Sequence, residues 1–198
     1  MEAAEHAWHG DAVCAREGAV VTFLQVVTRT FGQRAPLLAR NQASLANLED
    51  DDWLQTVVRD SVGRGVDWAN ANLATVPASG EYVWVLDDDD VCANTALIGA
   101  LKNLRGAAVI VCRATHARFG VLPHDAHWGR PPVLGDCSWS NYFVRADVWE
   151  AHRSYLAECA VYEGDYRFAA HLWGSVGPFA PCDVVAAHYP RVGRGAPQ

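Results

Sequence analysis

Four consecutive aspartates, Asp87 to Asp90, directly follow the apolar and aromatic segment Tyr82–Leu86. Gathering like charges at the end of a buried strand is costly, because the carboxylates repel one another and lose solvent. In an extended backbone Asp87 and Asp89 point to one side, whereas Asp88 and Asp90 point to the other. Two carboxylates on one side supply the oxygen ligands of a hard divalent cation, which in turn binds phosphate oxygens. The run therefore predicts a metal and phosphate site, with a solvated acidic turn as the alternative.

The segments around this run alternate between strand-like and helix-like patterns. Val20–Val27 is a continuous apolar, β-branched run, which is typical of a strand buried on both faces. Such alternation predicts an α/β fold with a mostly parallel central sheet and helices on both faces. The expected strands are Val20–Val27, Gln55–Arg59, Tyr82–Leu86, Ala107–Cys112, Asn141–Arg145 and Val184–Ala187. The expected helices begin near Pro36, where leucines recur at helical spacing, and span Val66–Ala74, Thr95–Leu104 and Asp165–Trp173.

Four segments in the first half of the chain carry a resemblance to a known family. They are VVTRTFGQR at 26–34, RNQASLANL at 40–48, VVRD at 57–60 and GEYVWVLDDDD at 80–90. In this order they resemble the donor-binding half of glycosyltransferases with the GT-A fold, in particular the inverting family 2, whose Asp-x-Asp signature the last segment resembles. The resemblance implies a single GT-A-like (nucleotide-diphospho-sugar transferase) domain over 1–198, with a donor half at 20–112, an acceptor half at 113–190 and a tail at 191–198.

The resemblance also implies roles for residues at the carboxyl ends of the strands, where parallel sheets bind ligands. Asp89 would bind Mn²⁺ or Mg²⁺ bridging the donor's diphosphate, and Asp87 would hold the ribose or share the metal. Asp60 resembles the family's base-reading aspartate, with a turn cap as an equally weighted alternative. The expected donor-binding residues are Thr28, Arg29, Asp60, Asp87 and Asp88. The family's Ala-Arg-Asn stretch appears here as Ala69–Asn72, which leaves open whether Asn70 or Asn72 corresponds.

A glycosyltransferase also needs a base that deprotonates the acceptor hydroxyl. Glu163-Gly164-Asp165, ahead of a helix-like segment, resembles the acidic motif that carries this base in family 2. Asp165 is therefore the expected base and Glu163 its substitute, while a carboxylate that only caps the helix is the structural alternative. Trp128 and Trp139 offer flat apolar faces for stacking an acceptor sugar, although most large aromatic side chains fill cores.

Histidines supply further candidate metal ligands. His188, after the apolar segment Val184–Ala187, resembles a late histidine that completes the metal shell in many GT-A enzymes. Imidazole suits Mn²⁺ better than Mg²⁺, and a lone histidine is more often structural. His124 and His127 are three residues apart, which suits one helical face, but Pro123 and the loop composition argue against a helix there.

The composition narrows the class of protein. With 51% hydrophobic and 20% charged residues, the chain is typical of a soluble globular protein. Its formal net charge of −7 argues against nucleic acid and anionic lipid as partners, since both need a positive face. The sequence shows no secretory signal and no apolar run long enough to span a membrane. None of the six cysteines forms a Cys-x-x-Cys pair, so we expect buried free thiols in a cytoplasmic protein.

These features predict a metal-dependent glycosyltransferase that moves a sugar from a nucleotide-diphosphate sugar to a hydroxyl acceptor, inverting by resemblance. The acceptor is left open among a glycan, a lipid-linked molecule and a small molecule. One alternative is a haloacid-dehalogenase-like phosphatase with Asp87 as nucleophile, since Asp87-x-Asp89-x-Val91 matches that signature. Against it, the signature normally lies on the first strand, and the only lysine, Lys102, follows closely. A non-catalytic nucleotide- or sugar-binding module is the other alternative.

Overall fold

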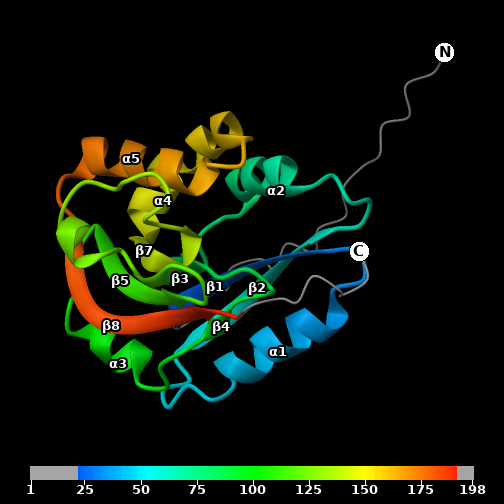
Figure 1. Cartoon of the computed structure of the whole chain (residues 1–198), viewed down its shortest axis with the longest axis horizontal. Coiled ribbons are helices and arrows are strands. Elements are labelled where there is room, and N and C mark those ends of the chain that lie inside the picture. The colour runs from blue at the N-terminus through cyan, green and yellow to red at the C-terminus, as the bar shows by residue number, and fades with distance from the viewer. Residues whose placement is uncertain (1–21, 191–198) are drawn as a thin grey trace, which may run out of the picture.

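One twisted sheet runs through the middle of the molecule in the computed structural model, which describes residues 22–190 (Figure 1). Within that range the sheet has eight strands in the order β2-β1-β3-β7-β5-β8-β4, with β6 paired to β5 outside this path. The strands are β1 (Thr22–Phe31), β2 (Trp53–Asp60), β3 (Gly80–Val85), β4 (Val91–Cys92), β5 (Val109–His116), β6 (Gly120–Leu122), β7 (Tyr142–Arg145) and β8 (Ala180–Tyr189).

Five of these strands, β1, β2, β3, β5 and β8, run in one direction, as the parallel pairings and the two antiparallel steps through β7 require. The short strands β4, β6 and β7 run the other way. The carboxyl ends of β1, β2 and β3 therefore meet at one edge, where parallel sheets bind ligands. The predicted α/β class with a mostly parallel sheet is confirmed.

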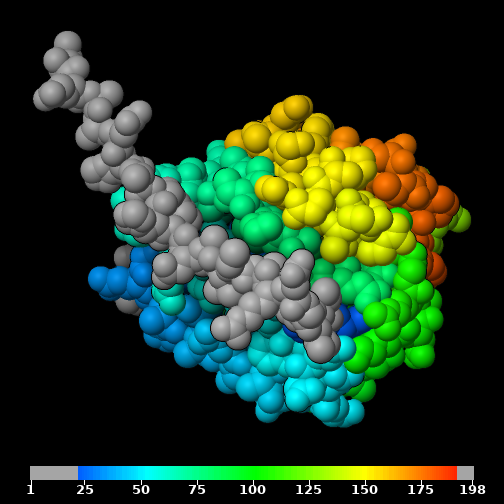
Figure 2. All heavy atoms as spheres, turned by 180° about the vertical axis from the view of Figure 1, so that it is seen from behind, coloured from blue at the N-terminus to red at the C-terminus, as the bar shows by residue number. Residues whose placement is uncertain are grey.

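Helices cover both faces of the sheet (Figure 1). The helices α1 (Ala35–Leu45) and α3 (Leu97–Lys102) lie on one face. The helices α2 (Val66–Asn72), α4 (Ala146–His152) and α5 (Gly164–Val176) lie on the other. Short 3₁₀ segments follow at η1 (Leu73–Thr75), η2 (Asp125–His127), η3 (Trp139–Asn141) and η4 (Arg153–Cys159). Figure 2 shows from behind how η4, in yellow, lies beside α2, in green.

The alternation of side chains along β3 explains why an apolar core forms on each face of the sheet. Val83 and Val85 pack into the core beneath α2, α4 and α5. Tyr82 and Trp84 point the other way, into a second core with leucines of α1 and α3. Because both faces of the strand are buried from Tyr82 on, its sequence from Tyr82 to Val85 is apolar and aromatic.

The expected elements are all present among the described residues, with shifted ends. The first expected strand begins in residues outside the described range and continues past Val27 to Phe31, through the buried polar residues Thr28, Arg29 and Thr30. The helix α4 and the strands β4 and β6 are absent from the sequence expectations. Among residues 22–190 no helix combines the length and apolar character that crossing a bilayer requires.

The two expected halves of the chain share the sheet. The strand β7, from the acceptor half, lies between β3 and β5 of the donor half. The strand β8 pairs with β4, directly after the aspartate run, where Val91 lies opposite His188. Both halves therefore position the aspartates.

Candidate active site

A buried ion pair joins the ends of β1 and β3. Arg29 of β1 contacts Asp87 through two hydrogen bonds, Nε to Oδ1 at 2.7 Å and Nη2 to Oδ2 at 2.6 Å. Arg29 is 8% exposed. A guanidinium is buried at an acceptable cost only when its charge is paired in good geometry. The pair fixes the position of the first aspartate of the run.

The asparagine of α2 that belongs to the site is Asn70. Its side-chain oxygen accepts hydrogen bonds from Nη1 of Arg29 and, at 3.1 Å, from Nε1 of Trp139. Its amide nitrogen donates to the Val161 carbonyl at 2.6 Å. Asn72 has no such role, since its contacts are with the local residue Thr75. Asn70 thus joins the donor side of the sheet to the acceptor half.

The helix α1 holds the backbone of the aspartate run from the opposite face. The buried amide of Asn41 donates to the carbonyls of Asp87 at 3.0 Å and Asp90 at 3.1 Å. Asn41 is itself held by Gln55, whose amide donates to its oxygen at 2.9 Å and to the Thr28 hydroxyl at 2.8 Å. Asn41 is a positioning residue that the sequence analysis missed.

Asp88 and Asp89 both face Arg34, at the start of α1. Arg34 Nη2 lies 3.0 Å from Asp88 Oδ1 and 2.6 Å from Asp89 Oδ2. The expected alternation, with Asp87 and Asp89 on one side, is wrong because the chain turns here: the Asp90 N–H donates to the Asp87 carbonyl at 3.0 Å. Asp88 is 1% exposed, and among the described residues its carboxylate accepts no hydrogen bond. Burial raises the pKa of Asp88 to about 6.

Asp165 lies in the first turn of α5, and one of its oxygens accepts the backbone N–H of Tyr166 at 2.7 Å. Burial raises the pKa of Asp165 to about 6, with Asp87 adding to the rise and Arg29 opposing it. Gly164 allows this placement, because a Cβ there would lie 2.5 Å from the Cys159 carbonyl oxygen. The glycine of the acidic motif is therefore required by close packing.

Asp90 and Tyr189 complete the same region and were not expected as site residues. Asp90 is buried, and its pKa is well above the ordinary value because of burial and the neighbouring charges of Asp87 and Asp89. The Tyr189 hydroxyl contacts the hydroxyls of Ser138 and Ser140. Both residues line the cavity that Asp165 lines.

Two adjoining cavities meet at the Arg29–Asp87 pair. The Asp165 cavity, of about 350 Å³, is lined by residues that include Asn70, Asp90, Trp139, Asp165 and Tyr189. The Arg34 cavity, of about 400 Å³, is lined by residues that include Arg34, Asp60, Trp68, Asp88 and Asp89. Arg29, Val66, Asp87 and Tyr162 line both. Their sizes are typical of small-molecule sites.

Three expected site residues lie elsewhere. The Thr28 side chain faces Asn41 and lines neither cavity. His188 bonds through Nδ1 to the Thr115 hydroxyl at 2.6 Å; since Tyr189, the next residue along β8, lines the Asp165 cavity, His188 points away from it. Trp128 lies under the Arg113 guanidinium, 4.2 Å from the ring centroid, beside a separate small cavity. None of these three side chains therefore lines either of the two cavities at the aspartate run.

Asp60 lies at the end of β2 and lines the Arg34 cavity. Its two oxygens accept backbone N–H groups of the following loop, from Val62 at 3.1 Å, Gly63 at 3.0 Å, Gly65 at 3.3 Å and also from Arg64. The carboxylate therefore organises this loop as a turn cap. Contact with a base would require it to exchange one of these bonds.

The phosphatase alternative has no support in this geometry. Asp87 follows the third strand of the chain, and Arg29 occupies both of its oxygens. Lys102 pairs with Asp50 at 2.8 Å and Asp52 at 2.9 Å, ahead of β2, at the amino end of the strands. The single lysine therefore lies toward the amino ends of the parallel strands, whereas Asp87 lies at their carboxyl ends.

The aspartate run fits a hard divalent cation in its donor chemistry. Asp87, Asp88 and Asp89 supply carboxylate oxygens, which Mg²⁺ and Mn²⁺ prefer. The specific observation is that, within residues 22–190, neither oxygen of the buried Asp88 carboxylate has a hydrogen-bond partner, which buried polar atoms normally have, and that its one ion-pair contact is between Oδ1 and Arg34 at 3.0 Å. In this structure Arg34 supplies the positive charge beside Asp88 and Asp89.

The topology and the position of the site define a GT-A-like fold. Structures of S. aureus TarS share it: residues 1–349 in complex with UDP align with a TM-score of 0.62 at 16% identity, over 84% of this chain and 60% of that chain. The same segment in complex with UDP-GlcNAc gives a TM-score of 0.59 at 13% identity, over 84% and 58% of the two chains. The chain thus spans about three fifths of the TarS segment's length.

The likeness to TarS rests on structure and is not accompanied by a sequence match. No protein-family model matches the chain, and no curated protein matches it. The likeness to TarS, at low identity, shows the fold. The expected GT-A-like glycosyltransferase fold is therefore confirmed, while membership of the inverting family 2 stays a prediction.

Proposed function

We propose that this protein is a glycosyltransferase that transfers a sugar from a nucleotide-diphosphate sugar to a hydroxyl acceptor with inversion. The observation that carries the proposal is the convergence of Asp165 with the Arg29–Asp87 pair on one cavity, beside a second cavity that holds Arg34. A base and an anion-binding region separated by one ion pair suit a sugar whose leaving group departs on one side and whose acceptor arrives on the other.

The Arg34 cavity is the proposed donor site. Arg34 can pair with phosphate oxygens, and Arg64, whose guanidinium lies 4.7 Å from the Trp68 ring centroid, stands beside this cavity. TarS structures in complex with UDP and UDP-GlcNAc support a nucleotide-sugar donor. Asp89 with Asp87 and Asp88 would hold Mn²⁺ or Mg²⁺, which neutralises charge on the departing diphosphate. His188 is left out of this proposal.

The Asp165 cavity is the proposed acceptor site, with Trp139 in its wall. Asp165 takes the proton of the acceptor hydroxyl as the hydroxyl oxygen attacks the anomeric carbon. The bond from that carbon to the diphosphate breaks on the opposite face. A pKa of about 6 leaves Asp165 ionised at neutral pH and makes it a stronger base than an ordinary carboxylate. Arg29 keeps Asp87 in place and attracts the charge of Asp165. The acceptor is a glycan, a lipid-linked molecule or a small molecule.

The decisive experiment compares Asp165→Asn with Glu163→Gln, which tests the substitute base in the wall of the same cavity. A panel of nucleotide sugars, screened by thermal stabilisation with Mn²⁺, first identifies the donor. We expect Asp165→Asn to lower turnover about 10²- to 10⁴-fold and to keep the donor Kd within about twofold, because a base acts mainly in the transition state. A wild-type protein that binds the donor without any turnover would instead be the non-catalytic module.

The role of the aspartate run is tested with Asp89→Ala. This variant should lose donor turnover and metal-dependent nucleotide binding together, because both depend on the same carboxylate. Asp51→Ala, at an exposed aspartate outside the site, is the control. Calorimetric titration with nucleoside diphosphate, with and without Mn²⁺, measures the binding. Survival of both properties in Asp89→Ala would contradict the metal role.

A cytoplasmic location stays part of the proposal. Among the described residues five cysteines are free thiols, and four of them are buried. Free buried thiols agree with a reducing compartment. Cys14 lies outside the described residues.

A further inference from the structure

We propose a second metal site, away from the aspartate run, in which His124, His127 and Asp136 bind one Zn²⁺ ion. These side chains each offer a ligand atom, and the three atoms lie within 4.8 Å of one another. Among the residues that the structure describes, no other group of three such side chains converges in this way. The mechanism proposed above uses none of the three.

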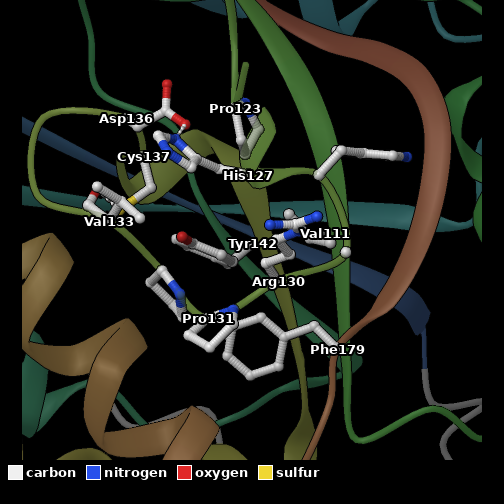
Figure 3. A pocket seen from close by; sticks show the side chains of 13 residues that line it. Val111, Pro123, His127, Arg130, Pro131, Val133, Asp136, Cys137, Tyr142 and Phe179 are labelled. Atoms are coloured by element: carbon white, nitrogen blue, oxygen red, sulfur yellow. Dashed lines mark hydrogen bonds and ion pairs between the residues drawn. The ribbon is translucent and has the colours of Figure 1, made fainter. Parts of the chain in front are cut away.

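The local backbone aligns the two imidazoles. His127 ends the 3₁₀ segment η2, and His124 immediately precedes it. Side chains three residues apart in a 3₁₀ turn lie one above the other. Both rings consequently face the same carboxylate: His127 Nδ1 lies 2.6 Å from Asp136 Oδ2, and His124 Nδ1 contacts Asp136 Oδ1. Figure 3 shows the His127 ring beside Asp136. A single 3₁₀ turn thus brings the two rings to one side, where Pro123 and the loop composition argue against an α-helix.

Asp136 is the fixed ligand of the group. Its side chain is 6% exposed, and the backbone N–H of His124 donates to both of its oxygens at 3.1 Å. Among the described residues no lysine or arginine pairs with this carboxylate, whose partners are the two histidines. A buried carboxylate that lacks a cationic side chain but faces two imidazole nitrogens is suited to a metal ion.

The two histidines are the ligands that can adjust. Their side chains are 54% and 39% exposed for His124 and His127, so the rings can withdraw toward solvent. Metal–nitrogen bonds of about 2.0–2.1 Å require each ring to move by about 1 Å from its present contact with the carboxylate. The Nδ1 protons then pass to Nε2, which is a change of tautomer without a change in ring charge.

The ligand set selects the class of metal. Two imidazole nitrogens and one carboxylate oxygen suit Zn²⁺ and disfavour Mg²⁺ and Ca²⁺, which prefer oxygen ligands throughout. The exposed side of the rings leaves a fourth position for water, as in three-ligand zinc sites. The ion would tie together residues 124–136, and the residues that follow, Cys137, Ser138 and Trp139, line the Asp165 cavity. Bound zinc should therefore hold that wall in place, through a three-ligand site rather than the closed four-ligand shell of structural zinc sites.

Zinc titration of the chelator-treated full-length chain tests the site. Calorimetry should show one Zn²⁺ equivalent fewer for the double variant His124→Ala/His127→Ala than for the wild type, and zinc should raise the melting temperature of the wild type more than that of the double variant. The Co²⁺-loaded wild type should show the visible absorption of a four-coordinate site. The double variant should not show this absorption. Binding by the aspartate run is unaffected, so it cancels in the comparison.

Asp125→Asn is the matched control. Its side chain belongs to the same 3₁₀ segment, is 93% exposed and pairs with Arg113 rather than with the cluster. It should keep the full zinc stoichiometry and the Co²⁺ spectrum. Because His124 is exposed and His127 is half-buried, the double variant should keep its circular dichroism spectrum; if it does not, His127→Gln alone carries the test. Equal zinc stoichiometry in the wild type and the folded histidine variant would overturn the proposal.

Discussion

The two cavities share the Arg29–Asp87 pair and differ in what else surrounds them. The Asp165 cavity gathers carboxyl groups of raised pKa, Asp90 and Asp165, with Arg29 as the cation that attracts both charges. The Arg34 cavity adds a second guanidinium, which is 23% exposed and paired loosely with two carboxylates. This difference supports the proposed division, in which proton transfer and anion binding lie on opposite sides of one ion pair.

The largest effect should follow from removing the shared pair. Arg29→Ala leaves Asp87 without its bidentate partner and Asn70 without one of its donors, so we expect a loss of about 3 kcal/mol in the free energy of unfolding. Donor turnover should fall with it, because both cavities lose a wall. Urea denaturation at pH 7 measures the stability.

Arg34→Ala is the comparison for that variant. Arg34 is partly exposed and screened by solvent, so its removal should cost less than about 1 kcal/mol of stability and should mainly weaken donor binding. Equal losses of stability in the two variants would remove the distinction between a rigid pair and an adjustable one.

The next effect concerns pH and belongs to the Asp165 cavity alone. Asp165 has to be ionised to accept a proton, and its pKa is about 6. We expect kcat/KM to fall about tenfold for each pH unit below 6, while the donor Kd changes less over the same range. A pH profile of the wild type, repeated with Asp165→Asn, separates this limb from others. A limb that persists in the residual activity of Asp165→Asn belongs to another group.

The smallest effect is a gain in stability at Asp88. Its folded pKa, about 6, lies above its ordinary value, so the folded state binds a proton more tightly than the unfolded chain and the resulting stability is lost as pH rises through 6. Asp88→Asn should raise the free energy of unfolding at pH 7 by about 1 kcal/mol, because the amide carries no charge but still lacks partners. The gain should vanish below about pH 4, where the wild-type carboxyl is protonated in both states. Urea unfolding at pH 4 and pH 7 checks the sign, and weaker metal-dependent donor binding should accompany the gain.

The sequence predicts the fold where the signal is local and apolar. The β-branched runs of β1 and β3 and the leucine spacing of α1 identify their elements, because burial on both faces of a parallel sheet leaves an apolar pattern. The strand β4 is two residues long and exists through its pairing with β8, so no local pattern marks it. The helix α4 follows β7 directly and is only seven residues long. Its sequence carries no apolar stripe, so the sequence does not predict it.

The charged residues of the candidate site could be predicted from the sequence, whereas the residues that position them could not. Asp87 and Asp165 follow from motifs a few residues long, and the structure places both on one cavity. Asn41 and Tyr189 act through contacts across 46 to 51 positions of the chain, which a single sequence does not reveal. Thr28 and His188 show the converse: His188 lies near the end of β8 as expected and Thr28 lies inside β1, but both side chains face away from the two cavities.

The insertion of β7 between β3 and β5 has a consequence for any attempt to dissect the protein. A fragment ending at residue 112 would expose the edge of β3 that pairs with β7, cut β5 in half and leave the segment after the aspartates without its partner from β8. Unpaired edges of this kind recruit other chains. The proposed donor half should therefore not fold as an independent fragment. Such a fragment should aggregate on expression rather than bind nucleotides.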